Sequence, residues 1–262
     1  MTAQPDPKTR MAPRPRRIDD PPAATVMRWL ARGWLDFRSH PAQAISYGTM
    51  LALLGWGGIA LLWHWGLSWM ILPALAGAML VGPAATVGIY RISRLAMGRE
   101  GRLASPGQVA LAGAILMVLM LTWLRAATLI FAVFFGLVPF SGFTETLLSL
   151  LQSPQGIATV VTGTLIGGLF AAFTFAISAF SIPMLVDHEL DCFSAMALSF
   201  SATIHNFKLA VTWGATVSGA ILIGVCTGFV GLIFLFPLLG FATWHAYCDL
   251  FHGETQHDDH AS

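Results

Sequence analysis

The feature that most constrains the fold is an apolar run over residues 108–140 that contains a single charge, Arg125. A helix needs only about 20 apolar residues to cross the hydrocarbon core of a bilayer, and this run is 33 residues long. An arginine at mid-bilayer costs roughly 2.5–3.5 kcal/mol on insertion scales, so Arg125 is expected to face protein or water rather than lipid. The run therefore predicts a membrane-spanning helix that carries one intramembrane charge.

Composition places the whole chain in the same class. Hydrophobic residues make up 56% and charged residues 10%, and the mean hydropathy is +0.70, which lies outside the range of soluble globular proteins. Spans and short connections use nearly all 262 residues, so no separate soluble domain has room. Cys192, Cys226 and Cys248 show no CxxC spacing and are expected to be packing residues rather than a disulfide framework.

Further apolar runs predict an all-α, polytopic membrane protein with about six transmembrane helices in three hairpins, plus interfacial amphipathic helices. The membrane domain is expected over residues 41–251, with Pro73 and Pro83 as kinks. Two interpretations of the third run stay open. It is either one strongly tilted helix, or an interfacial first third followed by a span that begins near Met117, and the second is favoured. The expected spans are residues 42–63, 70–90, the run at 108–140, 157–185, 209–226 and 229–250.

The remaining segments are expected at the membrane surface. Residues 1–22 read as a disordered basic tail, and residues 252–262 as a polar tail rich in His and Asp. Residues 23–40 have the apolar and basic faces of an interfacial helix, with Arg32 and Asp36 one turn apart and able to pair. A docking helix for a partner protein is the alternative. Residues 141–156 and 193–204 are further candidate interfacial helices.

The distribution of basic residues tests this topology. With the N-terminus in the cytoplasm, every Lys and Arg except Arg125 lies on the cytoplasmic side, and the three outer connections contain none. An error of one span would place the loop with Arg91, Arg94, Arg99 and Arg102 outside. The sequence therefore predicts an even number of spans, both termini in the cytoplasm, and a bacterial inner membrane location.

Three strings carry a family resemblance: GPAATVGIYRISRLAMGRE, LTWLRAATLIFAVFF and FAISAFSIPMLVDHELDCFSAMALSFSATIHN. They resemble a family of proteobacterial inner-membrane proteins known as domain of unknown function 2189, over roughly residues 29–251. The resemblance implies an integral membrane protein of unassigned activity. Some members are described as resembling cytochrome c oxidase subunit I. Haem-copper chemistry needs several histidines facing one another within the membrane, and only His245 could lie inside a span, so no haem or other cofactor is expected.

Three groups of polar residues are candidates for chemistry. Arg125 could attract an anion or pair with an acidic residue of another subunit, or it could simply snorkel to the surface. A cytoplasmic cluster of Asp187, His188, Glu189 and Asp191 could act in acid-base catalysis, although a solvated helix cap is the favoured interpretation. The C-terminal tail could bind a divalent metal, but a solvated tail is favoured. The tail residues concerned are His252, Glu254, His257, Asp258, Asp259 and His260.

Two functional hypotheses follow. The favoured one is a non-enzymatic accessory or assembly component of a membrane complex, with a respiratory complex as one candidate, because small-residue faces and interfacial helices accompany no catalytic motif. Glycines and alanines recur at four-residue intervals from Gly163, which allows close helix approach. The alternative is a small transporter or channel in which Arg125 lines an anion path. The expected partners are the lipid bilayer and another membrane protein complex, and no nucleic acid.

Overall fold

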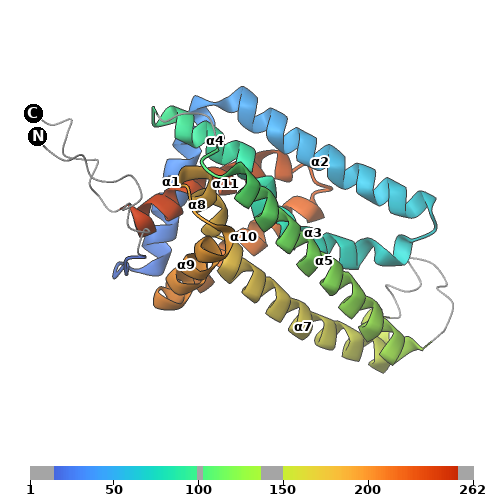
Figure 1. Ribbon diagram of the computed structural model, residues 1–262. Coiled ribbons are helices and arrows are strands. Elements are labelled where there is room, and N and C mark those ends of the chain that lie inside the picture. Colours follow the sequence, from blue (N-terminus) through green and yellow to red (C-terminus); the bar gives the residue numbers. More distant parts are fainter. Residues whose placement is uncertain (1–14, 99–102, 137–149, 253–262) are drawn as a thin grey trace, which may run out of the picture.

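The computed structural model describes residues 15–98, 103–136 and 150–252, and these residues form helices and connections without a strand (Figure 1). Six helical segments in this part are long and apolar enough to cross a membrane, which confirms the expected all-α polytopic fold and six spans. The elements are α1 (Pro22–Ser39), α2 (Pro41–His64), η2 (Ser68–Met70), α3 (Ile71–Ala85), α4 (Val87–Ala96), α5 (Pro106–Phe135), α7 (Pro154–Ser178), α8 (Ser181–Asp187), α9 (Cys192–His205), α10 (Phe207–Cys226) and α11 (Leu232–Phe251).

The third span is one uninterrupted helix, so the favoured interpretation with an interfacial first third is wrong. Helix α5 runs for 30 residues from Pro106, which at 1.5 Å per residue makes it about 45 Å long. Pro106 is at the first turn, where a missing N–H costs nothing. Because the helix is longer than the hydrocarbon core, tilt or protrusion takes up the excess. The expected helix at 141–156 lies mostly outside the described residues.

Two of the spans are broken helices. The second consists of α3 and α4, which meet at Thr86, three residues after Pro83; Pro73 lies in the first turn of α3 and causes no break. The fourth consists of α7 and α8, and its break precedes Pro183. At that break the Ser199 hydroxyl donates to Ala176 O (2.8 Å) and accepts from Phe180 N (3.1 Å). A neighbouring helix thus satisfies backbone groups that the break frees.

Helix α11 packs mainly against α1 and α2. Glycines permit both contacts. A Cβ at Gly33 of α1 would lie 2.7 Å from the Ala242 backbone nitrogen, and one at Gly48 of α2 would overlap the backbone of Ile233. These approaches bring helix backbones together where no larger residue fits.

The apolar face of α1 packs against protein. Trp29 is fully buried, stacks edge-on with Trp213 of α10 (5.7 Å) and donates to Asp249 Oδ2 (2.8 Å). The expected Arg32–Asp36 pair does not form, because both residues reach α11 instead: Arg32 pairs with Asp249 (2.9 Å). Asp36 pairs with His245 (2.9 Å). Tertiary partners have replaced the local one.

Part of the predicted disordered tail is also ordered. Residues 1–14 and 253–262 lie outside the described residues, but Arg16 N donates to Leu250 O (2.9 Å). The side chain of Asn206 accepts from Ile18 N (2.9 Å) and donates to Arg16 O (3.0 Å). One buried asparagine therefore anchors residues 16–18 to the α9–α10 junction.

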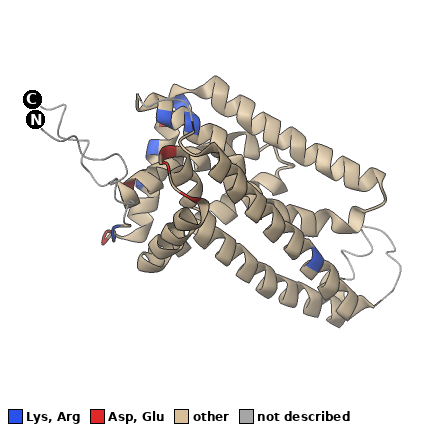
Figure 2. Ribbon diagram, in the orientation of Figure 1, with Lys and Arg blue, Asp and Glu red and all other residues tan. Residues whose placement is uncertain are grey.

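Charges gather at one end of the bundle, as Figure 2 shows, and we call this the charged end. Within the described ranges, Arg125 on α5 is the single charge that lies towards the opposite end. Helix α9 lies at the charged end with Phe193, Phe200 and Ile204 exposed and Ala195, Ser199 and Ala202 buried. These three large apolar residues point outward, as expected of an interfacial helix, whereas Met196 of the same predicted face is buried.

Candidate functional site

The buried carboxylate of Asp187 is the centre of a polar cluster at the charged end. Asp187 is the last residue of α8, whose seven residues are all buried, and its side chain is 1% exposed. Arg94 of α4 places Nε 3.3 Å from Asp187 Oδ1 and donates from Nη1 to Val186 O (2.8 Å). The Tyr247 hydroxyl of α11 donates to Asp187 Oδ2 (3.1 Å). A buried carboxylate requires such charged and hydrogen-bonding partners.

Two histidines complete this cluster. His188 follows Asp187 directly, and His252 lies just beyond α11. Their Nε2 atoms lie 3.6 Å and 3.2 Å from Asp187 Oδ2, and their rings stack with centroids 5.4 Å apart. The Tyr247 ring stands edge-on to His252 at 5.2 Å. We call Arg94, Asp187, His188, Tyr247 and His252 the Asp187 cluster.

The start of α5 holds the loop that follows Asp187. Ser105 Oγ donates to His188 O and accepts from Leu190 N, each at 3.2 Å. Gln108 Oε1 accepts from Cys192 N (2.9 Å). Four parts of the chain therefore meet here, namely α4, the start of α5, the α8–α9 loop and the end of α11.

The four residues that the sequence grouped together are divided in the structure. Asp187 and His188 belong to the cluster, whereas Glu189 and Asp191 are exposed. Asp191 is the N-cap of α9 and accepts from Ser194 N (2.9 Å), and hydrogen bonds from Ser194 lower the pKa of its carboxyl. For Asp191 the helix-cap interpretation fits. Next to it, burial and the Asp191 charge raise the pKa of the Cys192 thiol, which favours a packing role.

Sequence reasoning did not assign Arg94, Tyr247 or His252 to this cluster. The sequence places His252 in the polar C-terminal tail and Arg94 in a basic loop, and no motif includes Tyr247. One signal was available for Arg94, because it shares a buried face of α4 with Ile89, Tyr90 and Ser93 at helical spacing. No local pattern connects positions 94, 187 and 252, since only the fold brings them together.

Arg125 lies apart from this cluster. Its side chain is exposed, and Phe135 at the end of α5 is ten residues further, or about 15 Å. In the described ranges no hydrogen bond or ion pair involves it. Arg125 also lines neither of two cavities found among the spans.

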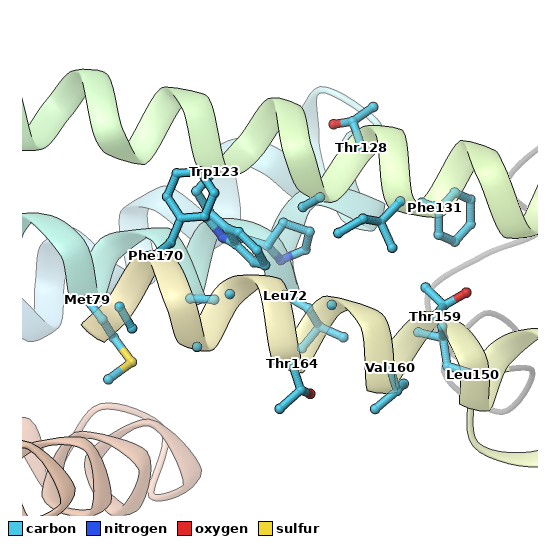
Figure 3. A pocket seen from close by; sticks show the side chains of 18 of the residues that line it. Leu72, Met79, Trp123, Thr128, Phe131, Leu150, Thr159, Val160, Thr164 and Phe170 are labelled. Atoms are coloured by element: carbon cyan, nitrogen blue, oxygen red, sulfur yellow. The ribbon is translucent and has the colours of Figure 1, made fainter. Parts of the chain in front are cut away.

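The larger cavity lies between α3, α5 and α7 and has a volume of about 480 Å³ (Figure 3). Its walls are almost entirely apolar. Two of the residues that line it, Leu72 and Val160, are 44% and 42% exposed, so the cavity opens at the surface of the bundle. Trp123 closes one side, donating from Nε1 to Pro73 O (3.0 Å). A Cβ at Gly167 would lie 2.8 Å from the Trp123 ring, so this glycine gives the close approach predicted for α7.

Other small residues of α7 border the cavity instead of a helix. Apart from its chain neighbours and the nearby backbone of α7, no described atom lies within 4 Å of a Cβ built at Gly163 or at Gly168, and both residues line the cavity wall. The predicted small-residue face is therefore partly packed, at Gly167, and partly open. We call the wall formed by Gly163, Gly168 and Val160 the open face of α7.

The fold and these sites define the class of the protein, a polytopic α-helical membrane protein whose bundle would contact the lipid bilayer. Residues 71–187 match the family described as "Predicted integral membrane protein (DUF2189)", so this stretch of the chain is similar to that family. The matched stretch, which covers the second to fourth spans, is shorter than the expected resemblance over residues 29–251. Neither the curated proteins nor the solved structures include a significant match.

Proposed function

We propose that this chain is a non-enzymatic accessory or assembly component of a larger membrane complex, and that it binds a transmembrane helix of its partner on the open face of α7. A respiratory complex is one candidate. The proposal includes a bacterial inner membrane location with both termini in the cytoplasm, which the charged end and the positive-inside pattern support.

The observation that carries this proposal is the open face of α7. Each glycine within a helix costs about 1 kcal/mol relative to alanine, yet Gly163 and Gly168 border open space. In membranes, small residues at an interface let helix backbones approach closely, and van der Waals packing then drives association. Gly163 and Gly168 lie about 140° apart around α7, so a partner helix seated on this wall would approach the backbone closely at one or the other.

The lining of the cavity favours an apolar occupant. The hydroxyls of Thr128 and Thr159, which border it, donate to Leu124 O and Gln155 O of their own helices, each at 2.8 Å. These threonines therefore have their donors engaged within the protein. Aliphatic or aromatic side chains of a partner helix match such a wall.

Arg125 gives separate support. Trp123 and Ala127 of α5 line the cavity. Arg125 is two positions from each of them along the helix, so its side chain is rotated by about 200° around the helix axis relative to theirs. It lies on the exposed side of α5 within an apolar helix, where a partner carboxylate would offset its cost in lipid. The transporter hypothesis placed Arg125 on an anion path through the protein, and its position away from both cavities favours the accessory hypothesis.

The test is affinity purification of the tagged protein from native membranes in mild detergent, followed by mass spectrometry. We expect a stoichiometric membrane partner with the wild type. Gly163→Leu and Gly168→Leu fill the open face and should reduce partner recovery at least tenfold. Gly57→Leu is the matched control, because Gly57 of α2 also has no described atom within 4 Å of a built Cβ.

Equal expression and a monodisperse elution profile for all variants separate loss of the partner from loss of the fold. Recovery of the wild-type protein alone would contradict the proposal. So would equal partner recovery with Gly163→Leu and Gly57→Leu, because the open face would then make no contact.

A further inference from the structure

The Asp187 cluster contains three side chains of types that bind transition metals. A carboxylate oxygen of Asp187 and one ring nitrogen each of His188 and His252 all lie within 4.8 Å of one another. These groups come from the end of α8 and from the end of α11, so the last described residue of the chain meets the end of the fourth span. Imidazole and carboxylate ligands together suit zinc, iron and nickel.

The distances fit a shared metal ion. Zinc bonds to nitrogen and oxygen are about 2.0–2.1 Å, so two ligand atoms of a tetrahedral site lie about 3.3–3.4 Å apart. The separations of His252 Nε2 and His188 Nε2 from Asp187 Oδ2 are 3.2 Å and 3.6 Å. Both distances to Asp187 Oδ2 are thus within a few tenths of an ångström of those in a tetrahedral site, and all three ligand atoms lie within 4.8 Å of one another. A direct hydrogen bond from an imidazole to the carboxylate is the competing explanation of the 3.2 Å contact.

The surrounding residues hold the ligands in place. Arg94 contacts Oδ1, the other carboxylate oxygen, and its contact with Val186 O fixes the guanidinium. Oδ2 is thereby directed towards the imidazoles, while the Tyr247 hydroxyl and ring contact Asp187 and His252. Metal ligands are commonly oriented by such partners. The positive charge of Arg94 also weakens the attraction for a cation, so binding weaker than at a zinc site without a nearby cation is expected.

We propose that Asp187, His188 and His252 form a binding site for a divalent transition metal, with zinc as the ion that fits best. The metal would connect the fourth span to the sixth at the charged end. Its role would be structural, because its ligands come from two helix ends that the ion would hold together, with water as the fourth ligand beside the three from the protein. Metal binding to the folded state would then raise stability. This site is independent of the open face of α7.

The test uses the full-length protein with a tag that contains no histidine, stripped with a chelator and reconstituted with Zn²⁺. Bound zinc is measured by mass spectrometry after desalting, and thermal unfolding is followed with and without Zn²⁺. We expect about one zinc per chain and a higher Tm with zinc for the wild type. His188→Gln and His252→Gln should each reduce bound zinc at least fivefold and abolish the rise in Tm.

Two controls make the result specific. His64→Gln removes a histidine at the end of α2 and should retain the zinc. The double variant His257→Gln with His260→Gln removes the histidines of the C-terminal tail and should also retain it. Because glutamine keeps similar volume, and the His252 side chain is 26% exposed, His252→Gln should still fold.

The proposal is overturned if the reconstituted wild type binds no zinc. It is also overturned if the tail variant loses the zinc while His188→Gln and His252→Gln keep it. In the first case the Asp187 cluster would be a hydrogen-bonded and ionic contact between helix ends. In the second the tail itself would be the metal site.

Discussion

Replacing Ser199 with alanine should destabilise the protein far more than replacing another serine of α9. Ser199 is fully buried, and its hydroxyl bridges Ala176 O and Phe180 N across the break between α7 and α8. Alanine leaves both backbone groups without this partner. Ser201, two positions further along α9, is the matched control, because its hydroxyl makes an exposed 3.3 Å contact with the His205 ring.

The magnitude follows from the two backbone groups. A buried polar group left unsatisfied costs roughly 1–3 kcal/mol, so the Ser199 variant should lose about 2–6 kcal/mol of unfolding free energy. Changes at exposed contacts usually stay within about 0.5 kcal/mol, which is the expectation for Ser201→Ala. Both changes replace serine with alanine in the same helix, so the gain in helix propensity cancels in the comparison.

The assay is reversible denaturant unfolding in mixed micelles, followed by tryptophan fluorescence and by circular dichroism. The difference between the two variants is the quantity of interest. If Ser199→Ala and Ser201→Ala change the unfolding free energy equally, the hydroxyl does not stabilise the break, and the account of the fourth span is wrong.

Two further predictions concern helix contacts and caps. Gly48→Leu should prevent α2 from packing on α11, because even a Cβ there overlaps the Ile233 backbone, so its Tm should fall while Gly57→Leu stays near wild type. Asp191→Ala should cost about 1 kcal/mol near pH 6, since it removes the hydrogen bond to Ser194 N. The pKa of Asp191 is lowered in the folded state, so the stability that its carboxylate adds is present above the ordinary carboxyl pKa and is lost as the pH falls through the lowered pKa. The unfolding free energies of the wild type and Asp191→Ala, measured at pH 6 and near pH 3, should therefore differ less at the lower pH.

The sequence was sufficient to predict the spans, because membrane insertion depends on hydropathy along a single segment. It was not sufficient for the third span, where the continuity of α5 contradicts the expected interfacial portion. The break before Pro183 was not among the predicted kinks, which were Pro73 and Pro83. Its remedy, the Ser199 hydroxyl, comes from another helix and leaves no local signal.

Pairings between distant segments account for the other differences. Arg32 and Asp36 are well placed to pair on one helix, yet each has a partner on α11, because packing of the apolar face of α1 brings its charges there. His252 looked like part of a solvated tail until the end of α11 placed it beside Asp187. Such contacts depend on helix packing, which periodicity within one segment does not specify.

The most direct test of the central proposal is photo-crosslinking in native membranes, which distinguishes a protein neighbour from lipid. A photoreactive amino acid at Val160, on the open face of α7, is compared with one at Leu53 on α2, which is 66% exposed. We predict a discrete protein adduct from Val160 and lipid adducts alone from Leu53. Lipid adducts alone at Val160, or the same protein adduct from both positions, would contradict the proposal that the open face binds a partner helix.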